Sequence, residues 1–270
     1  MEIKELKQIS TEIRKTIVEA VHAAGSGHPG GSLSAADIMT VLYFEEMNID
    51  PANPEMADRD RFVLSKGHAA PVLYATLAER GFFPKEDVLT LRKIGGKFQG
   101  HPCRDKVEGV EMSTGSLGQG ISVAMGMALA DKLDNKDRKV FTLLGDGEIQ
   151  EGLVWEAAMA ASHYGLKNFT AIIDWNGLQI DGNNDDVMTV RPIDEKFKAF
   201  GWDVIVIDGH DFEYIRKGFE FAKNSDKPTS IIAKTHNYKP IVPSKLDIAV
   251  REGLGNNSLT WTDTYKASAR

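Results

Sequence analysis

Along most of this chain, the spacing of hydrophobic residues alternates between the period of a helix and that of a strand. Apolar positions recur every three or four residues over 3–24, which predicts a first amphipathic helix. Short apolar runs at 140–144, 169–173 and 202–207 predict buried strands instead. Further strands are predicted at 61–65 and 229–234, and further helices at 35–46, up to Arg80, at 85–95, after Gly120, after Gly147, at 193–200 and at 212–223. This alternation predicts an α/β fold whose central sheet is mostly parallel and carries helices on both faces.

The clearest single unit runs from Lys139 to Gln179. A buried strand ends at Gly145-Asp146-Gly147, a helix with acidic opening turns follows, and a second strand ends at Asp174-Trp175-Asn176. Strand, turn, helix and strand form a βαβ unit. Its polar residues lie at the carboxyl ends of the strands, where parallel sheets bind their ligands.

These strand ends carry the oxygen atoms that a hard metal ion prefers. Asp146 offers a carboxylate and Asn176 an amide oxygen, and Mg²⁺ usually takes only one or two protein carboxylates beside phosphate and water. Gly147 would let a backbone N–H reach a phosphate group. An Asp-Gly pair by itself is often an ordinary turn. The strand before it, the helix after it and the asparagine on the next strand favour a metal–diphosphate site.

Three histidines stand in glycine-containing segments: His28, His68 and His101. His68 follows a predicted strand and precedes a helix, a position suited to an anion. Each could also be a linker, capping or core histidine. Histidine suits substrate chemistry because its charge changes near neutral pH and its ring offers both a donor and an acceptor. His210 lies in a strand-to-helix turn before a helix N-cap, Asp211, and is interpreted as structural.

A glycine-rich segment, 113–120, precedes a helix of small residues. Its spacing is G-x-x-G-x-G, and no strong strand precedes it. The G-x-G-x-x-G loop of a dinucleotide-binding fold is therefore rejected.

Composition narrows the class of protein. The 32 basic and 39 acidic residues give a net charge of −7 without a basic run, so neither nucleic acid nor an anionic membrane is expected as a partner. A single cysteine, Cys103, excludes an internal disulfide and fits a reducing cytosol. No apolar run is long enough to span a bilayer, and a cytoplasmic location is expected.

Several motifs together resemble one family. Gly145-Asp146-Gly147 followed after a gap by Asn176 resembles the thiamine diphosphate signature, and GDGEIQEG with IDWNGLQIDG is similar to transketolase. SGHPGGSLS, LSKGHA and the 113–120 segment resemble transketolase loops too, although Ser113 and Ser116 replace the more usual threonine and proline. The similarity is dense over about residues 10–235.

The resemblance implies roles for individual residues. The metal, Mg²⁺ or Ca²⁺, would be bound by Asp146, Asn176 and the backbone carbonyl of Leu178. His68, Gly115, Leu117 and Gly147 would hold thiamine diphosphate, and His68 would also contact the reacting carbon as a catalytic residue. His28 and His101 would handle the protons and hydroxyls of the substrate. Glu151 and Glu156 match carboxylates that link the two cofactor sites across a dimer, with Glu151 counted among the catalytic residues.

The resemblance also implies an incomplete enzyme. We expect a thiamine diphosphate-binding domain over 1–235 and an atypical tail over 236–270, where the expected glycine-rich loop and its histidine are missing. The glutamate that engages the cofactor's pyrimidine, and the arginines for sugar phosphate, belong to a second domain that nothing in this sequence resembles. The chain therefore resembles the N-terminal subunit of a split transketolase of the pentose phosphate pathway, with a separate C-terminal subunit in an α₂β₂ heterotetramer.

Such an enzyme would transfer a two-carbon ketol unit from a ketose phosphate to an aldose phosphate. Three alternatives stay open. One is a split transketolase for a sulfonated or branched sugar, and a second is an enzyme similar to 1-deoxyxylulose-5-phosphate synthase. The third is a non-catalytic homologue that binds cofactor or a partner without turnover.

Overall fold

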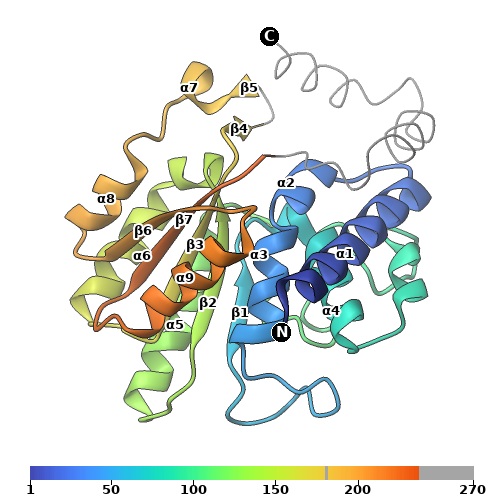
Figure 1. Ribbon diagram of the computed structural model, residues 1–270, viewed down its shortest axis with the longest axis horizontal. Coiled ribbons are helices and arrows are strands. Elements are labelled where there is room, and N and C mark those ends of the chain that lie inside the picture. The colour runs from blue at the N-terminus through green and yellow to red at the C-terminus, as the bar shows by residue number, and fades with distance from the viewer. Residues whose placement is uncertain (180–181, 237–270) are drawn as a thin grey trace.

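The computed structural model describes residues 1–179 and 182–236, and its centre is a five-stranded parallel sheet (Figure 1). The strand order is β1-β2-β3-β7-β6. The strands are β1 (Arg61–Leu64), β2 (Val140–Gly145), β3 (Phe169–Trp175), β6 (Asp203–Asp208) and β7 (Thr229–Lys234), and a small antiparallel pair is formed by β4 (Leu178–Gln179) and β5 (Gly182–Asn183). The predicted α/β fold is thereby confirmed.

Helices join the strands in the expected order. The α-helices are α1 (Ile3–Ala24), α2 (Pro29–Ser34), α3 (Ala36–Val41), α4 (Ala70–Arg80), α5 (Gln119–Leu133), α6 (Gly152–His163), α7 (Asn184–Val187), α8 (Ile193–Ala199) and α9 (Phe212–Lys223). A π-helical turn, η1 (Leu42–Glu46), extends α3, and the 3₁₀ segments are η2 (Gly67–Ala69), η3 (Lys85–Thr90) and η4 (Gly147–Gln150). As predicted, Asp211 caps α9, accepting bonds from the N–H groups of Glu213 and Tyr214.

Three local predictions were wrong in detail. The segment 25–32, expected to be a loop, contains the start of the helix α2, because Pro29 at its first position is already fixed near a helical φ. The helix predicted over 85–95 is the shorter 3₁₀ segment η3. The helix predicted directly after Gly147 is broken into η4 and α6, because Glu151 between them has an extended backbone.

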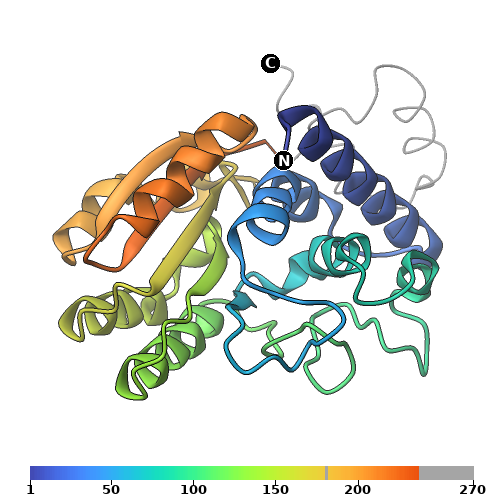
Figure 2. The same cartoon turned by 60° about the horizontal axis from the view of Figure 1, so that its bottom comes forward.

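Two hydrophobic cores fill the space between the sheet and its helices. Figure 2 shows from another side that helices lie on both faces of the sheet. Alternate residues of each strand point to opposite faces, so Phe141 and Leu143 of β2 pack with α1, α3, α4 and α9. Val140 and Leu144 point the other way, towards α5, α6 and α8. The sheet is thus covered on both faces and leaves its carboxyl edge for polar residues.

A buried ion pair joins the strands at that carboxyl edge. The Lys66 ammonium, just after β1, bonds the Asp174 carboxylate near the end of β3, with side chains 1% and 0% exposed. Asp174 also accepts the hydroxyls of Ser34 from α2 and Thr235 from the end of β7. Lys66 in turn donates to the carbonyl of Gly31 at 2.7 Å. One carboxylate therefore connects three strand ends and α2.

The surroundings of Asp174 favour its charged form. Burial by itself raises the pKa of Asp174, but the Lys66 charge and the hydrogen bonds from Lys66, Ser34 and Thr235 outweigh it and hold the pKa below its usual value. Removing one partner leaves the other charge buried and uncompensated, which is more costly than removing both.

This geometry predicts a strong coupling between Lys66 and Asp174. Lys66→Met and Asp174→Leu should each lower the free energy of unfolding by about 3–5 kcal/mol, whereas the double variant should lose clearly less than the sum. Urea denaturation of the four proteins gives the coupling energy. Additive losses would show that the two charges are not paired.

Candidate active site

Three histidines from separate loops meet above the carboxyl edge of the sheet. The ring of His28 lies 5.5 Å from that of His68 and 6.4 Å from that of His101, measured between ring centroids. His28 precedes α2, His68 lies in η2 after β1, and His101 follows η3 in an irregular loop. The structure therefore brings together the three histidines that the sequence singled out.

Residues of neighbouring helices hold the loops that carry His68 and His101. The hydroxyl of Tyr74, a buried residue of α4, donates to the carbonyls of Gln99 and His101 at 3.0 and 3.1 Å. Gly31 of α2 lies so close to His68 that a β-carbon there would be 3.4 Å from its Nε2 atom. The rings are thus positioned by backbone that has few alternatives.

The environment favours the neutral form of the three histidines. Burial, followed by the nearby Lys66 charge, lowers the pKa of His68 to about 3. Burial also lowers the pKa values of His28 and His101, and the charge of Arg92 adds to both effects. A neutral imidazole has one donor and one acceptor nitrogen, which suits hydrogen bonding to sugar hydroxyls.

Glycines allow the loop at 113–118 to pack directly on the His68 loop. A β-carbon on Gly67 would lie 2.7 Å from the backbone nitrogen of Gly115, and one on Gly120 would lie 2.5 Å from the α-carbon of Ser65. Gly115 itself approaches the ring of His101, which a β-carbon would meet at 3.3 Å. The glycine pattern here serves close backbone packing, and it places Gly115 beside the histidine cluster.

A buried carboxylate, Glu148, holds three of these loops together. It accepts the Ser65 hydroxyl, the N–H of Gly118 at 2.9 Å and the N–H of Gly145 at 3.0 Å. Burial raises its pKa, and these hydrogen bonds oppose the rise. The ends of β1 and β2 and the glycine-rich loop are therefore linked through one side chain.

The Asp146 carboxylate binds the loop that follows β3. Its oxygens accept the N–H of Gly147 at 2.9 Å and the N–H of Gly177 at 2.6 Å, and Asn176 Oδ1 accepts the N–H of Leu178 at 2.9 Å. The structure therefore brings Asp146, Gly147, Asn176 and Leu178 together at one point. The Gly147 N–H, expected to reach a phosphate, points at Asp146 instead.

These residues fit a hard divalent cation. Burial raises the pKa of Asp146 to about 6, because a charged carboxylate there has lost much of its hydration. A bound cation would offset that cost. A carboxylate has about four lone-pair sites and an amide oxygen has two, so the hydrogen bonds to Asp146 and Asn176 leave each of them able to bind metal.

Glu151 and Glu156, the carboxylates predicted to link cofactor sites across a dimer, do not bond to the histidine cluster in the part of the chain that the structure describes. Glu151 precedes α6 and Glu156 lies within it, and both are exposed. Among the described residues, no hydrogen bond or ion pair joins either one to the histidines.

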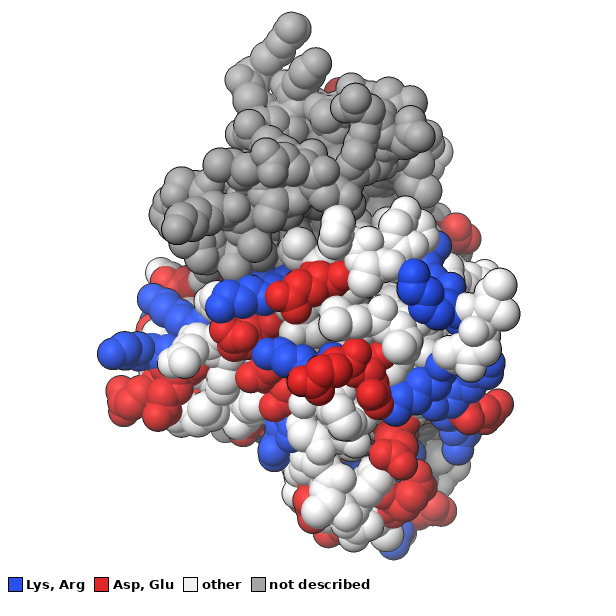
Figure 3. Space-filling model, turned by 90° about the vertical axis from the view of Figure 1, so that its right-hand side faces the viewer, with Lys and Arg blue, Asp and Glu red and all other residues white. Residues whose placement is uncertain are grey.

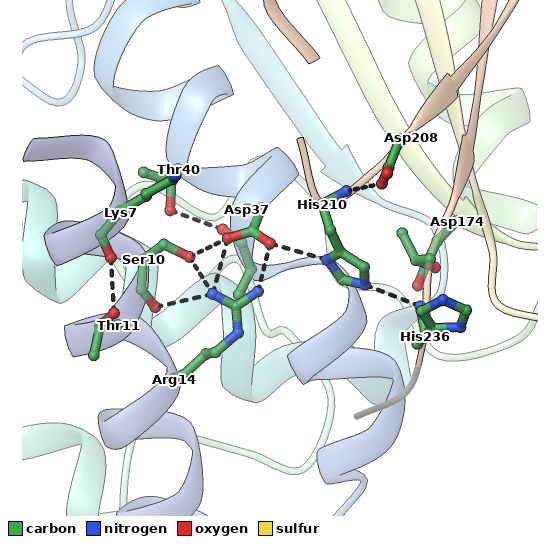
Figure 4. Close-up of polar contacts among 12 residues, drawn as sticks. Lys7, Ser10, Thr11, Arg14, Asp37, Thr40, Asp174, Asp208, His210 and His236 are labelled. Atoms are coloured by element: carbon green, nitrogen blue, oxygen red, sulfur yellow. Dashed lines mark hydrogen bonds and ion pairs between the residues drawn. The ribbon is translucent and has the colours of Figure 1, made fainter. Parts of the chain in front are cut away.

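His210 lies in a separate buried network beside the end of β7 (Figure 4). Its Nε2 accepts the backbone N–H of His236 at 3.0 Å, so its Nδ1 carries the proton and donates to Asp37 of α3 at 2.9 Å. Arg14 of α1 pairs with the same carboxylate at 2.8 Å. The contacts agree with the structural interpretation of His210.

The sequence interpretation gave no role to Lys66, Asp174 or Glu148. A signal was present, because a lysine between a strand and His68, and an aspartate ending an apolar strand, are charges at positions expected to be buried. Their pairing depends on the order of strands in the sheet, which the sequence pattern does not provide.

Figure 3 shows the distribution of charged side chains on one face of the molecule. Basic and acidic side chains are interspersed there over the described residues. No helix in the described part of the chain has the length and apolar character needed to cross a bilayer.

The chain is similar in sequence and structure to transketolases. A family described as "Transketolase, thiamine diphosphate binding domain" matches residues 5–240. The 6-deoxy-6-sulfo-D-fructose transketolase subunit SqwG of Clostridium sp. (strain MSTE9) is 44% identical over 232 residues, which are 86% of this chain and 84% of that protein. One of the subunits of the apulose-4-phosphate transketolase of Phocaeicola vulgatus is 43% identical over 242 residues, 89% and 86% of the two chains.

Longer transketolases match over part of their length. The human enzyme is 46% identical over 86% of this chain but only 37% of its own. The crystal structure of Campylobacter jejuni transketolase superposes with a TM-score of 0.82 and 39% identity, covering 87% of this chain and 38% of that one. This chain thus spans less than two fifths of the solved transketolase. It belongs to the family of the transketolase thiamine diphosphate binding domain.

Proposed function

We propose that this chain is the N-terminal subunit of a thiamine diphosphate-dependent transketolase. With a second chain it transfers a two-carbon ketol unit from a ketose phosphate to an aldose phosphate. The observation that carries the proposal is the meeting of His28, His68 and His101 with the Asp146 loop at one edge of the sheet, in a chain of this family.

The cofactor would be held through its diphosphate end. Asp146, Asn176 and the carbonyl of Leu178 would bind Mg²⁺ or Ca²⁺, and His68, Gly115, Leu117 and Gly147 would contact thiamine diphosphate. When bound, the cofactor supplies the carbon nucleophile and the electron sink that ketol transfer needs. The chain supplies orientation, through loops that Glu148 and Asp174 hold in place.

The histidines would serve the substrate. His28 and His101 are exposed at the mouth of the cluster, where they can bond the donor sugar's hydroxyls and move protons. His68 is more deeply placed and is neutral at physiological pH, so it can donate a hydrogen bond without adding a cation beside Lys66.

The existence of a partner chain is supported by two relatives. Both are named as transketolase subunits, and this chain covers 84% and 86% of their lengths, against 37% of the human enzyme. The partner would bring the pyrimidine-binding domain and the groups that bind the sugar phosphate, in a cytoplasmic α₂β₂ assembly. Exposed Glu151 and Glu156 are available to link cofactor sites between subunits.

Two classes of sugar are candidates for the substrate. Ordinary pentose phosphate pathway sugars are one class. The names of the two subunit relatives favour the other, since one names 6-deoxy-6-sulfo-D-fructose and the other apulose 4-phosphate. The division into 1–235 and 236–270 remains a prediction, because residues 237–270 lie outside the described part of the chain.

The test begins with co-purification. The full chain is tagged in its own host and isolated with thiamine diphosphate and Mg²⁺, co-purifying chains are identified, and ketol transfer is measured with unmodified, sulfonated and branched donors. We expect a partner of one to two domains and activity that chelation removes and Mg²⁺ restores. Asp146→Ala should abolish the metal-dependent part of cofactor binding.

Two results would count against the proposal. A chain that purifies alone and binds no thiamine diphosphate with metal would indicate a non-catalytic homologue. Turnover of pyruvate with an aldehyde, without ketol transfer, would favour the synthase alternative.

The position of His101 predicts a selective defect. His101→Ala should lower kcat/KM for the donor about 5- to 100-fold, the effect of leaving a sugar hydroxyl without its partner at a cost of about 1–3 kcal/mol. The affinity for thiamine diphosphate should stay within about threefold, because the other predicted cofactor contacts remain. His163→Ala provides the matched control, because His163 is an exposed histidine at the C-terminal end of α6 and has no predicted role in the site. Equal losses in donor use and cofactor affinity would remove His101 from the substrate side.

A further inference from the structure

Asn184 is a buried amide whose side chain has no hydrogen-bond partner among the described residues. It lies at the start of α7, the residue is 2% exposed, and neither Oδ1 nor Nδ2 is bonded within that part of the chain. A buried polar group without a partner costs about 1–3 kcal/mol. Native proteins rarely keep such a group unless it binds something else.

The backbone fixes Asn184 against the Asp146 loop. Its N–H donates to the carbonyl of Gly177 at 2.9 Å, and the N–H of Gly177 donates to Asp146 at 2.6 Å. Asn184 Oδ1 would lie 3.5 Å from a β-carbon on Gly147. Its amide also lies close enough to the Asp146 carboxylate to lower the pKa of that group.

The neighbouring amides are satisfied. Gln150 Nε2 donates to Gln179 Oε1 at 2.7 Å and to the carbonyl of Met188 at 2.9 Å, closing the loop above Gly147. Asn183, next in the chain, is exposed and donates to Asp186 at 2.9 Å. Among these amides, the missing bonds are therefore specific to Asn184.

We propose that Asn184 is a further side chain of the metal–diphosphate site, whose amide bonds the bound diphosphate or the water held by its metal. The proposal rests on the proposed function, since it takes thiamine diphosphate and Mg²⁺ as the ligand. An amide suits this position because it has a donor for phosphate oxygens and an acceptor for metal-bound water, which Mg²⁺ usually retains. Its lack of partners among the described residues is a cost to stability that binding removes.

The test combines binding with stability. Mn²⁺ replaces Mg²⁺ as the probe, and its uptake with thiamine diphosphate is followed by electron paramagnetic resonance on the full chain with its co-purified partner. Asn184→Leu has similar volume and no polar atoms. It should weaken Mn²⁺–thiamine diphosphate binding about 10- to 100-fold and raise the Tm of the ligand-free protein by about 2–4 °C. Asn184→Ala should weaken binding equally, and Asn183→Ala should leave both quantities unchanged.

The outcomes separate this proposal from the function on which it rests. Wild-type binding with unchanged affinity in both Asn184 variants would overturn the role of Asn184 and leave the proposed function standing. A fall in Tm for Asn184→Leu with unchanged affinity would identify Asn184 as a structural residue. Failure of the wild type and of Asn183→Ala to bind Mn²⁺ with thiamine diphosphate would overturn both.

Discussion

The buried pair of Lys66 and Asp174 is the contact on which the site depends most. It is formed at the edge where β1, β3, β7 and α2 meet, and the histidine cluster lies directly above it. A buried ion pair adds little stability compared with a well-packed apolar pair. Its value here is geometric, because Asp174 accepts three side-chain donors from three separate segments and so fixes their ends relative to one another.

Burial and the Lys66 charge together set the charge state of His68. Burial has the larger effect on the pKa of His68, and the adjacent Lys66 ammonium further disfavours a second cation there. His68 is therefore neutral at physiological pH. A site for a diphosphate with its metal gains from this arrangement, since the positive charge is held below the histidines while the rings remain free for directional hydrogen bonds.

Much of the fold followed from periodicity, and the site only in part. Strand-forming residues at 140–144, 169–173 and 229–234 have no other good interpretation, so the parallel sheet and its polar edge could be predicted. The meeting of His28, His68 and His101 was suggested by glycine context and family resemblance. Lys66, Glu148 and Asn184 were missed because their roles follow from what faces them across the sheet, and single-chain spacing does not contain that information.

The cofactor edge concentrates groups that lower stability when nothing is bound. Asp146 is ionised at neutral pH at a position where burial opposes charge, and Asn184 beside it keeps an amide without partners in the described part of the chain. The apolar cores on both faces of the sheet stabilise the domain independently of this edge. Binding of a cation and an anion together would satisfy both residues at once. Cofactor and metal should therefore bind cooperatively, because each supplies the charge that the other needs in a poorly hydrated site.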